Sequence, residues 1–269
     1  MGESSLTIAV PLGPDPAAAR ELVAVAAALV PPGPSGAGRV IAIETVPGRP
    51  SSLSQDTGAA KRQHAEPGPR PRIEVRAAAA TGAAGWPGVV AVARECSADL
   101  LLVDWRAWAD ASQSLFGSPL HEAITIAPCD LAAVRLGRLT RVRQVLLPVR
   151  GGPQGLLTLR LAMGLAERHD ATITLLHVEQ PGLLPDNDAE VRAQLDALLA
   201  RGAHPARAQP AIVIAGSVEA AIAVEAEAHQ VTIMGASPGD PGTPLLLGPV
   251  AEAVAAQVTG TLIIVKARE

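Results

Sequence analysis

Two loops carry the residue types with which a protein could hold a phosphate group. The stretch "MGASPGDPGTPLLLGPVAEAV", from Met234 to Val254, leads from an apolar strand through a Gly/Pro-rich loop into an apolar helix that a glycine opens. Backbone amides at such a helix start bind anions, because the helix dipole is positive there. This layout predicts a nucleotide or anion site that includes Gly235, Gly239 and Gly248.

The second loop contains Arg150, Gly151 and Gly152, directly after the apolar run Val145–Val149. An arginine can pair with phosphate, and glycines let backbone amides approach it closely. Each residue also has a plainer interpretation. A single arginine at a sheet edge is often solvated or paired with a carboxylate, and Gly235 and Gly248 could serve only a tight turn between strand and helix.

The chain contains the same pattern twice. "ADLLLVDWRAWADASQSLFGSPLHEAITIAPCDLAAVR" aligns without a gap with "HQVTIMGASPGDPGTPLLLGPVAEAVAAQVTGTLIIVK", so Asp104 corresponds to Gly235 and Gly117 to Gly248. Earlier in each half, Pro11 corresponds to Pro148. Gly117 and Ser118 are therefore the first-half remnant of the loop. Internal repetition of this kind predicts two similar structural units.

Each half alternates strands with helices. We expect strands at 5–10, 39–46, 72–77, 99–103 and 130–134, and again at 145–149, 171–179, 211–216, 231–234 and 261–266. In the second half we expect helices at 156–165, 189–199, 218–228 and 249–257. This alternation predicts two α/β domains, residues 1–138 and 139–269, each with a five-stranded parallel sheet.

One segment departs from the pattern. Residues Pro50–Pro71 are polar and contain proline, glycine and charges of both signs. Such a composition buries little apolar area, so we expect a mobile insert, with a short helix near Gly58–Ala65 as the alternative.

Composition excludes several classes of function. The formal net charge is −4, aromatic residues make up 1%, and no long basic run occurs, so nucleic-acid binding is not expected. Cys96 and Cys129 form no CxxC pair, which favours the reducing cytosol over a disulfide framework. No apolar run approaches the roughly 20 residues of a membrane span, and we expect no signal peptide. His121, His169 and His229 lack ligand spacing, and Ser118 lacks evident His/Asp partners. We therefore expect neither a metal nor catalytic residues.

Several blocks together resemble the universal stress protein family: "VTIMG", "LLLGPVAEAV" and "GSVEAAIAVEAEAHQV" in the second half, and "LFGS" and "APCDLAAVR" in the first. The resemblance implies two tandem copies of a five-stranded parallel α/β fold like that of adenine nucleotide alpha hydrolases. It also implies pairing of the two domains through their last strands, with a homodimer as a further assembly. Some family members bind ATP, others bind no nucleotide, and the family generally has no well-defined enzymatic chemistry.

The family loop G-x2-G-x9-G-[S/T] is altered in this chain. Arg150 stands where the resemblance implies an aspartate, Pro238 replaces the second glycine, and Pro249 replaces the hydroxyl residue. In the first half, Gly13 takes the aspartate position and Asp104 the first glycine. We therefore expect ATP or another nucleotide to bind weakly or not at all, and any binding to occur in the second half.

The segment "LLPVRGGPQGLLTLRLAMGLAERHDATITLLHV" also resembles, more loosely, the soluble cytoplasmic domains of amino-acid and cation transporters. Three functions follow. The first is a cytoplasmic, non-enzymatic stress-response or regulatory protein with a degraded nucleotide loop. The second is the regulatory domain of a transporter, at the inner face of the membrane and with that transporter as partner. The third is an ATP-binding protein with weak affinity.

Overall fold

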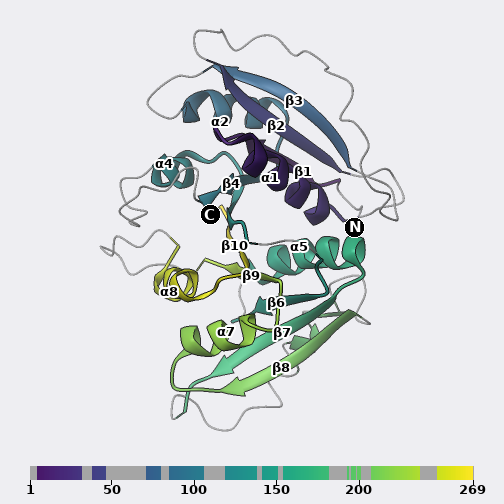
Figure 1. Cartoon of the computed structure of the whole chain (residues 1–269), viewed down its shortest axis with the longest axis vertical. Coiled ribbons are helices and arrows are strands. Elements are labelled where there is room, and N and C mark those ends of the chain that lie inside the picture. The colour runs from purple at the N-terminus through teal and green to yellow at the C-terminus, as the bar shows by residue number, and fades with distance from the viewer. Residues whose placement is uncertain are drawn as a thin grey trace. The chain divides into compact units, whose positions relative to one another are not determined.

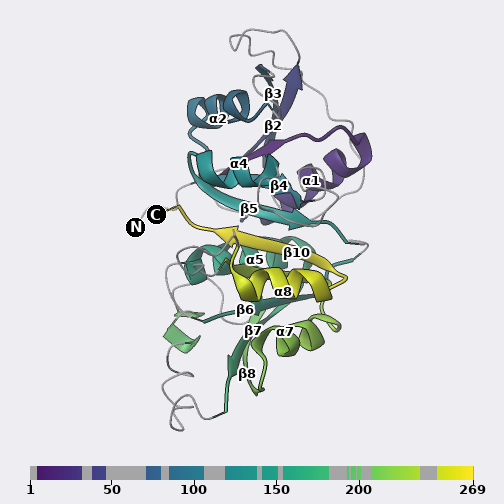
Figure 2. The same cartoon turned by 90° about the vertical axis from the view of Figure 1, so that its left-hand side faces the viewer.

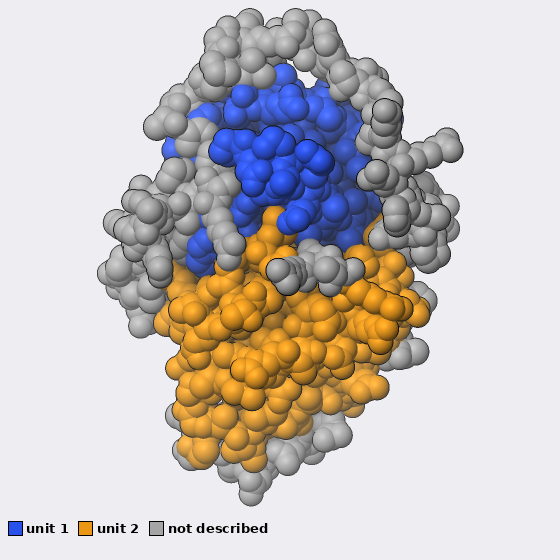
Figure 3. All heavy atoms as spheres, viewed as in Figure 1, with its two compact units in different colours: residues 1–134, 268–269 blue, residues 135–267 orange. Residues whose placement is uncertain are grey.

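A computed structural model divides the chain into two compact units. Unit 1 contains residues 1–134 and 268–269, and unit 2 contains residues 135–267 (Figure 3). The residues that the structure describes are 5–31, 38–46, 71–79, 85–105, 119–137, 141–150, 154–181, 193, 195–197, 199–200, 207–236 and 247–268.

Unit 1 is an α/β unit with a parallel sheet. Its described elements are β1 (Thr7–Pro11), α1 (Pro16–Leu29), β2 (Arg39–Val46), β3 (Arg72–Ala79), α2 (Trp86–Glu95), β4 (Leu100–Asp104), α4 (Pro119–Ile126) and β5 (Asp130–Arg135). The strands lie in the order β3-β2-β1-β4-β5, and their pairings run parallel (Figure 1).

Unit 2 repeats this architecture. Its described elements are β6 (Gln144–Pro148), α5 (Gln154–His169), β7 (Thr172–Glu179), β8 (Ala208–Ile214), α7 (Val218–Ala226), β9 (Val231–Gly235), α8 (Pro249–Gln257) and β10 (Thr261–Lys266). The strand order is β10-β9-β6-β7-β8, again with parallel pairing, and Figure 2 shows the same unit from the side.

Burial explains why these segments form strands and helices. Every residue of β1 and of β4 is buried, as expected for central strands of a parallel sheet that helices cover on both faces. In α1, the buried residues Leu22, Val25, Ala26 and Leu29 recur at helical spacing and form one apolar stripe. The apolar runs of the sequence therefore determine both the sheet and the helix face that packs on it.

Local caps determine where helices begin. The Oδ1 of Asp15 accepts a hydrogen bond from the N–H of Ala17 at 2.8 Å, and Pro16 occupies the first helical position of α1. In unit 2, the Oγ of Ser217 accepts from the N–H of Ala220 at 3.1 Å and starts α7. Both caps satisfy amides that lack partners within their own helix.

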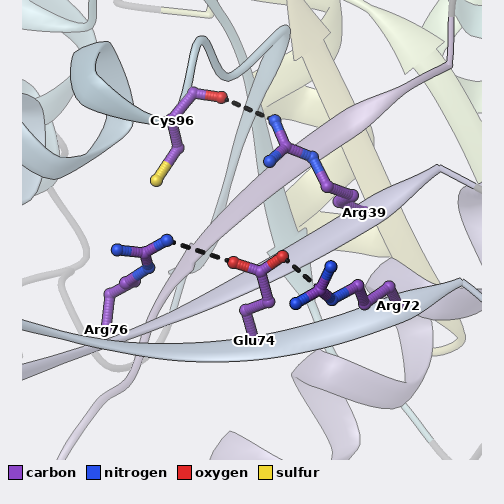
Figure 4. Close-up of polar contacts among 5 residues, drawn as sticks. All are labelled: Arg39, Arg72, Glu74, Arg76 and Cys96. Carbon is purple, nitrogen blue, oxygen red and sulfur yellow. Dashed lines mark hydrogen bonds and ion pairs between the residues drawn. The ribbon is translucent and has the colours of Figure 1, made fainter. Parts of the chain in front are cut away.

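One arginine of β2 contacts the end of α2, and two further arginines pair with a glutamate within β3 (Figure 4). Arg39 of β2 donates to the carbonyl oxygen of Cys96 at 3.0 Å, at the C-terminal end of α2, where a positive charge is favourable. Glu74 of β3 forms ion pairs with Arg72 and Arg76, each at 3.3 Å. Burial raises the pKa of the Cys96 thiol despite the nearby arginines, so this thiol stays protonated at neutral pH.

The structure confirms the predicted α/β fold class, and the bounds of β2, α8 and β10 agree with the prediction. The prediction for β8 was shifted: the strand spans Ala208–Ile214, whereas we expected 211–216. Pro210 lies outside the predicted strand but within β8, which is the last strand in the order of unit 2, and an edge strand tolerates a proline.

The predicted insert Pro50–Pro71 and its alternative helix Gly58–Ala65 lie outside the described residues, apart from Pro71. Of the predicted helix at 189–199, the described residues 193, 195–197 and 199 are helical.

Candidate functional site

In each unit, the chain first adds strands on one side of its first strand and then adds the remaining strands on the other side. In unit 2 the chain passes from β6 to β7 and β8 on one side, and then to β9 and β10 on the other. In unit 1 the same reversal separates β1 from β4. The loops that follow these two strands diverge at the carboxyl edge, and in open parallel sheets ligands bind in the resulting crevice. We refer to each of these places as the switch point of its unit.

The unit 2 switch point contains Arg150 and Gly235. The N–H of Val149 donates to the carbonyl oxygen of Leu176 at 2.9 Å, which holds the chain after β6, and Arg150 follows with an exposed side chain. Gly235 is the last residue of β9, and the N–H of the next residue, Ala236, donates to the carbonyl oxygen of Val265 at 2.7 Å. Gly235 ends β9 and Arg150 follows β6, so these two predicted residues flank the same reversal. Gly151, Gly152 and Gly239 lie outside the described residues.

Gly248 caps the N-terminus of α8 in a conformation that side chains rarely adopt. Its φ is 87° and its ψ is 160°, and no side chain caps the helix at this position. A residue with a Cβ is strained in this region, so the turn itself requires glycine. The backbone conformation of Gly248 therefore supports the plainer interpretation, in which this glycine serves a tight turn between strand and helix.

Two features of the α8 start reduce its capacity to hold a phosphate. Pro249 occupies the first helical position and contributes no N–H. The Oε1 of Glu252 accepts a hydrogen bond from the N–H of Leu247 at 3.2 Å, so one amide near the helix start already has an internal anionic partner. The carboxylate of Glu252 also lies in the first turn, where it interacts favourably with the helix dipole that would otherwise attract a ligand.

The unit 1 switch point has a different chemistry. Asp104 is the last residue of β4 and is 7% exposed, and Gly13 follows β1. Asp104 occupies the position at which Gly235 ends β9, so it places a carboxylate where a phosphate would approach. The glycine that would let a phosphate approach the backbone closely at this strand end is therefore absent from unit 1. Gly117 and Ser118 lie outside the described residues, and α4 begins directly after them at Pro119.

His177, which the sequence analysis did not assign to the site, lies beside the unit 2 switch point. It belongs to β7, the strand next to β6, and its Nδ1 lies 3.2 Å from the carbonyl oxygen of Val149. Sequence alone did not indicate this contact, because it depends on the register between β6 and β7. The sequence showed only that a histidine lies near the end of a predicted strand, 171–179.

His229 and Cys129, for which we expected no metal-binding or catalytic role, lie in surroundings that explain them without a ligand. Nδ1 of His229 lies 2.6 Å from the carbonyl oxygen of Glu225, and its Nε2 lies 2.9 Å from Oγ1 of Thr174. Burial, with smaller effects of Asp130 and Asp99, raises the pKa of Cys129 to about 12, which makes it a poor nucleophile. Among the described residues, no group of three or more His, Cys, Asp or Glu side chains could hold a metal ion.

None of the helices in the described part of the chain has the length and apolar character needed to cross a membrane.

Comparison with known sequences identifies a domain within unit 2. Residues 141–266 match the universal stress protein family. No match was found among curated protein sequences.

Solved structures with the same fold extend over both units. A universal stress protein from Archaeoglobus fulgidus is 11% identical, with 98% of this chain and 97% of that chain covered and a TM-score of 0.61. A protein from Pseudomonas aeruginosa UCBPP-PA14, assigned to the universal stress proteins, is 13% identical, with 98% and 94% coverage and a TM-score of 0.61. The cytoplasmic domain of a prokaryotic cation chloride cotransporter is 11% identical, with 97% and 95% coverage and a TM-score of 0.60. At these identities the similarity establishes the fold.

Proposed function

We propose that this chain is a non-enzymatic, cytoplasmic regulatory protein of the universal stress type with two tandem domains and a degraded nucleotide loop. The observation that carries the proposal is the start of α8. Pro249 removes one amide there, and Glu252 already binds the amide of Leu247. In unit 1, the carboxylate of Asp104 opposes an anionic ligand at the equivalent strand end.

The size of the effect can be estimated from the missing contacts. A hydrogen bond to a charged group contributes about 1.5–3 kcal/mol. Loss of the N–H at Pro249 and of the hydroxyl expected there removes two such bonds. Because about 1.4 kcal/mol corresponds to a tenfold change in affinity, the two losses together weaken ATP binding by roughly a hundredfold or more.

Calorimetric titration with ATP and magnesium at near-millimolar concentration tests this proposal. We expect weak or undetectable binding by the unmodified chain. Pro249→Ser restores both the N–H and a hydroxyl without moving the helix start, and we expect it to strengthen ATP binding by about tenfold or more. Leu156→Ala, on an exposed position of α5, serves as a control. A micromolar dissociation constant for the unmodified chain would overturn the proposal.

A second candidate is the regulatory domain of a membrane transporter. It is favoured by the similarity in fold to the cytoplasmic domain of a cation chloride cotransporter, which covers 97% of this chain. In that case the protein acts at the inner face of the membrane, with the transporter as its partner. The genomic sequence around the coding region separates the two candidates. Membrane-spanning segments in the same reading frame would support the transporter domain, and a self-contained frame would support the stand-alone protein.

A further inference from the structure

β3 forms an open edge of the unit 1 sheet. Among the described strands its neighbour is β2 alone, and Figure 1 shows β3 as the outermost arrow of that unit. The N–H of Arg72 donates to the carbonyl oxygen of Gly38 at 3.1 Å, on the β2 side. Because backbone groups alternate sides along a strand, the even-numbered residues of β3 bond to β2. The N–H and carbonyl groups of Ile73, Val75 and Ala77 therefore point away from the sheet.

The backbone of β3 lacks the proline that blocks the corresponding edge of unit 2. β3 is eight residues long and contains no proline. In β8, the last strand in the order of unit 2, the N–H of Ala215 donates toward β7, to the carbonyl oxygen of Glu179 at 2.9 Å. By the same alternation, Pro210 occupies a position whose N–H would point outward. The β8 edge is therefore interrupted, whereas β3 can accept a further strand.

The charged side chains of β3 have a self-complementary order. Glu74 forms ion pairs with Arg72 and Arg76, and the three side chains project from the same face of the strand (Figure 4). Charge at an edge usually discourages pairing, but Glu74 and Arg76 lie at equal distances on either side of Val75. In an antiparallel pair with a two-fold axis at Val75, Glu74 of each copy lies opposite Arg76 of the other. Opposite charges then face each other directly, and like charges lie on the longer diagonals.

Charge selects this register over its neighbours. Groups that point outward must pair with each other, so the alternatives place the two-fold axis at a different residue of β3. An axis at Glu74 places two glutamates opposite each other, and an axis at Arg76 does the same with two arginines, which is unfavourable. An axis nearer either end of β3 leaves fewer residues to pair. The axis at Val75 pairs residues 72–78 of both copies.

The opposite face of β3 is apolar and is complementary in size in the same register. It carries Ile73, Val75 and Ala77, because side chains alternate between the two faces of a strand. Ile73 is 44% exposed, and the other two are half-buried. With the axis at Val75, the large Ile73 lies opposite the small Ala77 of the second copy. Pairing therefore removes an exposed isoleucine from water.

We propose that β3 is a dimerisation edge, to which a second copy of this chain adds its own β3 in antiparallel orientation with the two-fold axis at Val75. The main-chain groups of Ile73, Val75 and Ala77 supply the hydrogen bonds, and the sheet of unit 1 continues into the second copy. Because the contact uses the same edge of both copies, assembly stops at the dimer. A single strand pair is a small interface, so the dissociation constant is expected to be micromolar or weaker.

The inference goes beyond the proposed function and does not rest on it. Resemblance to the universal stress proteins implies a homodimer as a further assembly, and β3 gives that assembly a surface distinct from the last strand of either domain.

Sedimentation equilibrium of the whole chain, from micromolar to near-millimolar concentration, tests the proposal. We expect a monomer–dimer equilibrium. Glu74→Arg places arginines opposite each other and Arg76→Glu places glutamates opposite each other, so each variant alone should dimerise about tenfold more weakly or worse. An equimolar mixture of the two variants places an arginine opposite a glutamate at each of these positions. We expect the mixture to form heterodimers with nearly the affinity of the unmodified chain.

Two further variants separate the edge from general electrostatics. Val75→Pro removes the central outward N–H without removing a bond to β2, and we expect it to abolish the dimer while the circular dichroism spectrum stays that of the folded chain. Arg72→Glu is the matched control. It makes the same change of charge as Arg76→Glu and affects the same carboxylate, with which both arginines pair at 3.3 Å. In the proposed register Arg72 lies opposite Ala78 of the second copy, so we expect Arg72→Glu to have much the smaller effect.

Three results would overturn the inference. The first is a chain that stays monomeric at all concentrations, which would leave the edge to a different protein. The second is a dimer that a folded Val75→Pro chain still forms. The third is equal weakening by Arg72→Glu and Arg76→Glu, or a mixture of the two charge variants that forms no heterodimer. If Val75→Pro does not fold, the mixture alone decides. The proposed function fails on tight binding of ATP, so the two failures are distinguishable.

Discussion

Replacement of Gly248 by alanine separates a structural role of this residue from a role in ligand binding. Gly248 adopts φ 87° and ψ 160°, a conformation accessible almost only to glycine. Holding a residue with a Cβ there costs about 1–3 kcal/mol. The neighbouring chain can relax only in part, because Leu247 is fully buried and the N–H of Glu252 donates to the oxygen of Gly248 at 3.0 Å. We therefore expect Gly248→Ala to destabilise unit 2 by this amount without any ligand present.

Urea unfolding followed by circular dichroism measures the effect. With a urea dependence of about 1–3 kcal/mol per molar, the midpoint should fall by roughly 1 M. Gly216→Ala is the matched control, because a Cβ built at Gly216 meets nothing within 4 Å and its φ is not in the left-handed region. We expect the control to be neutral or slightly stabilising, since alanine restricts the unfolded chain.

The reasoning fails if Gly248→Ala unfolds at the same urea concentration as the unmodified chain. A variant of unchanged stability that has lost a bound anion would instead assign Gly248 to ligand contact. The same strain also complicates substitutions of Gly248 as a test of nucleotide binding, because lost binding could follow from a distorted helix start. Variants of Pro249 and Arg150 avoid this difficulty.

Two further predictions concern packing and thiol reactivity. Gly88→Ala in α2 places a Cβ 2.1 Å from the backbone oxygen of Ala79, so the helix must shift, and we expect a lower thermal midpoint than for Gly216→Ala. The pKa of Cys129, about 12 against an ordinary 9.0, leaves about a thousandfold less thiolate at pH 8, so iodoacetamide should modify Cys129 far more slowly in the folded chain than in urea. Because its pKa is raised on folding, Cys129 also lowers the free energy of unfolding as the pH rises from 9 toward 12, and Cys129→Ala should reduce this alkaline loss. Comparable alkylation rates in the folded and unfolded chain would contradict a raised pKa of the Cys129 thiol in the folded chain.

The fold could be predicted because its information lies in short, local patterns. A continuous apolar run such as Leu100–Val103 has few alternatives to a buried parallel strand, and its repetition 131 positions later supports the same assignment. The bounds of β8 were harder to predict. Pro210 and Gln209 indicate a loop when only sequence is considered, and their place in a strand becomes clear only from the position of β8 at the edge.

The candidate site could be predicted only in part. The loops after β6 and β9 followed from glycine, proline and arginine in sequence order, so Arg150, Gly235 and Gly248 could be named. His177 could not be assigned, because its contact with Val149 joins residues on neighbouring strands and depends on register. The capture of the Leu247 amide by Glu252 was missed for a similar reason, since a glutamate in a first helical turn has several conformations available.

The two units have the same strand order, and they differ in which residue types occupy equivalent positions. The strand interiors are constrained on both faces by burial, and a polar substitution there carries a large cost, so Ile8 and Val145 remain apolar. Glu44 and His177, near the carboxyl ends of β2 and β7, and Arg150, after β6, are at least partly exposed, so this penalty is smaller there. Unit 1 has Glu44 where unit 2 has His177, and Gly13 where unit 2 has Arg150, while the hydrogen bonds after β1 and β6 are the same. Differences in charge near the strand ends therefore leave the backbone pairing of both sheets unchanged.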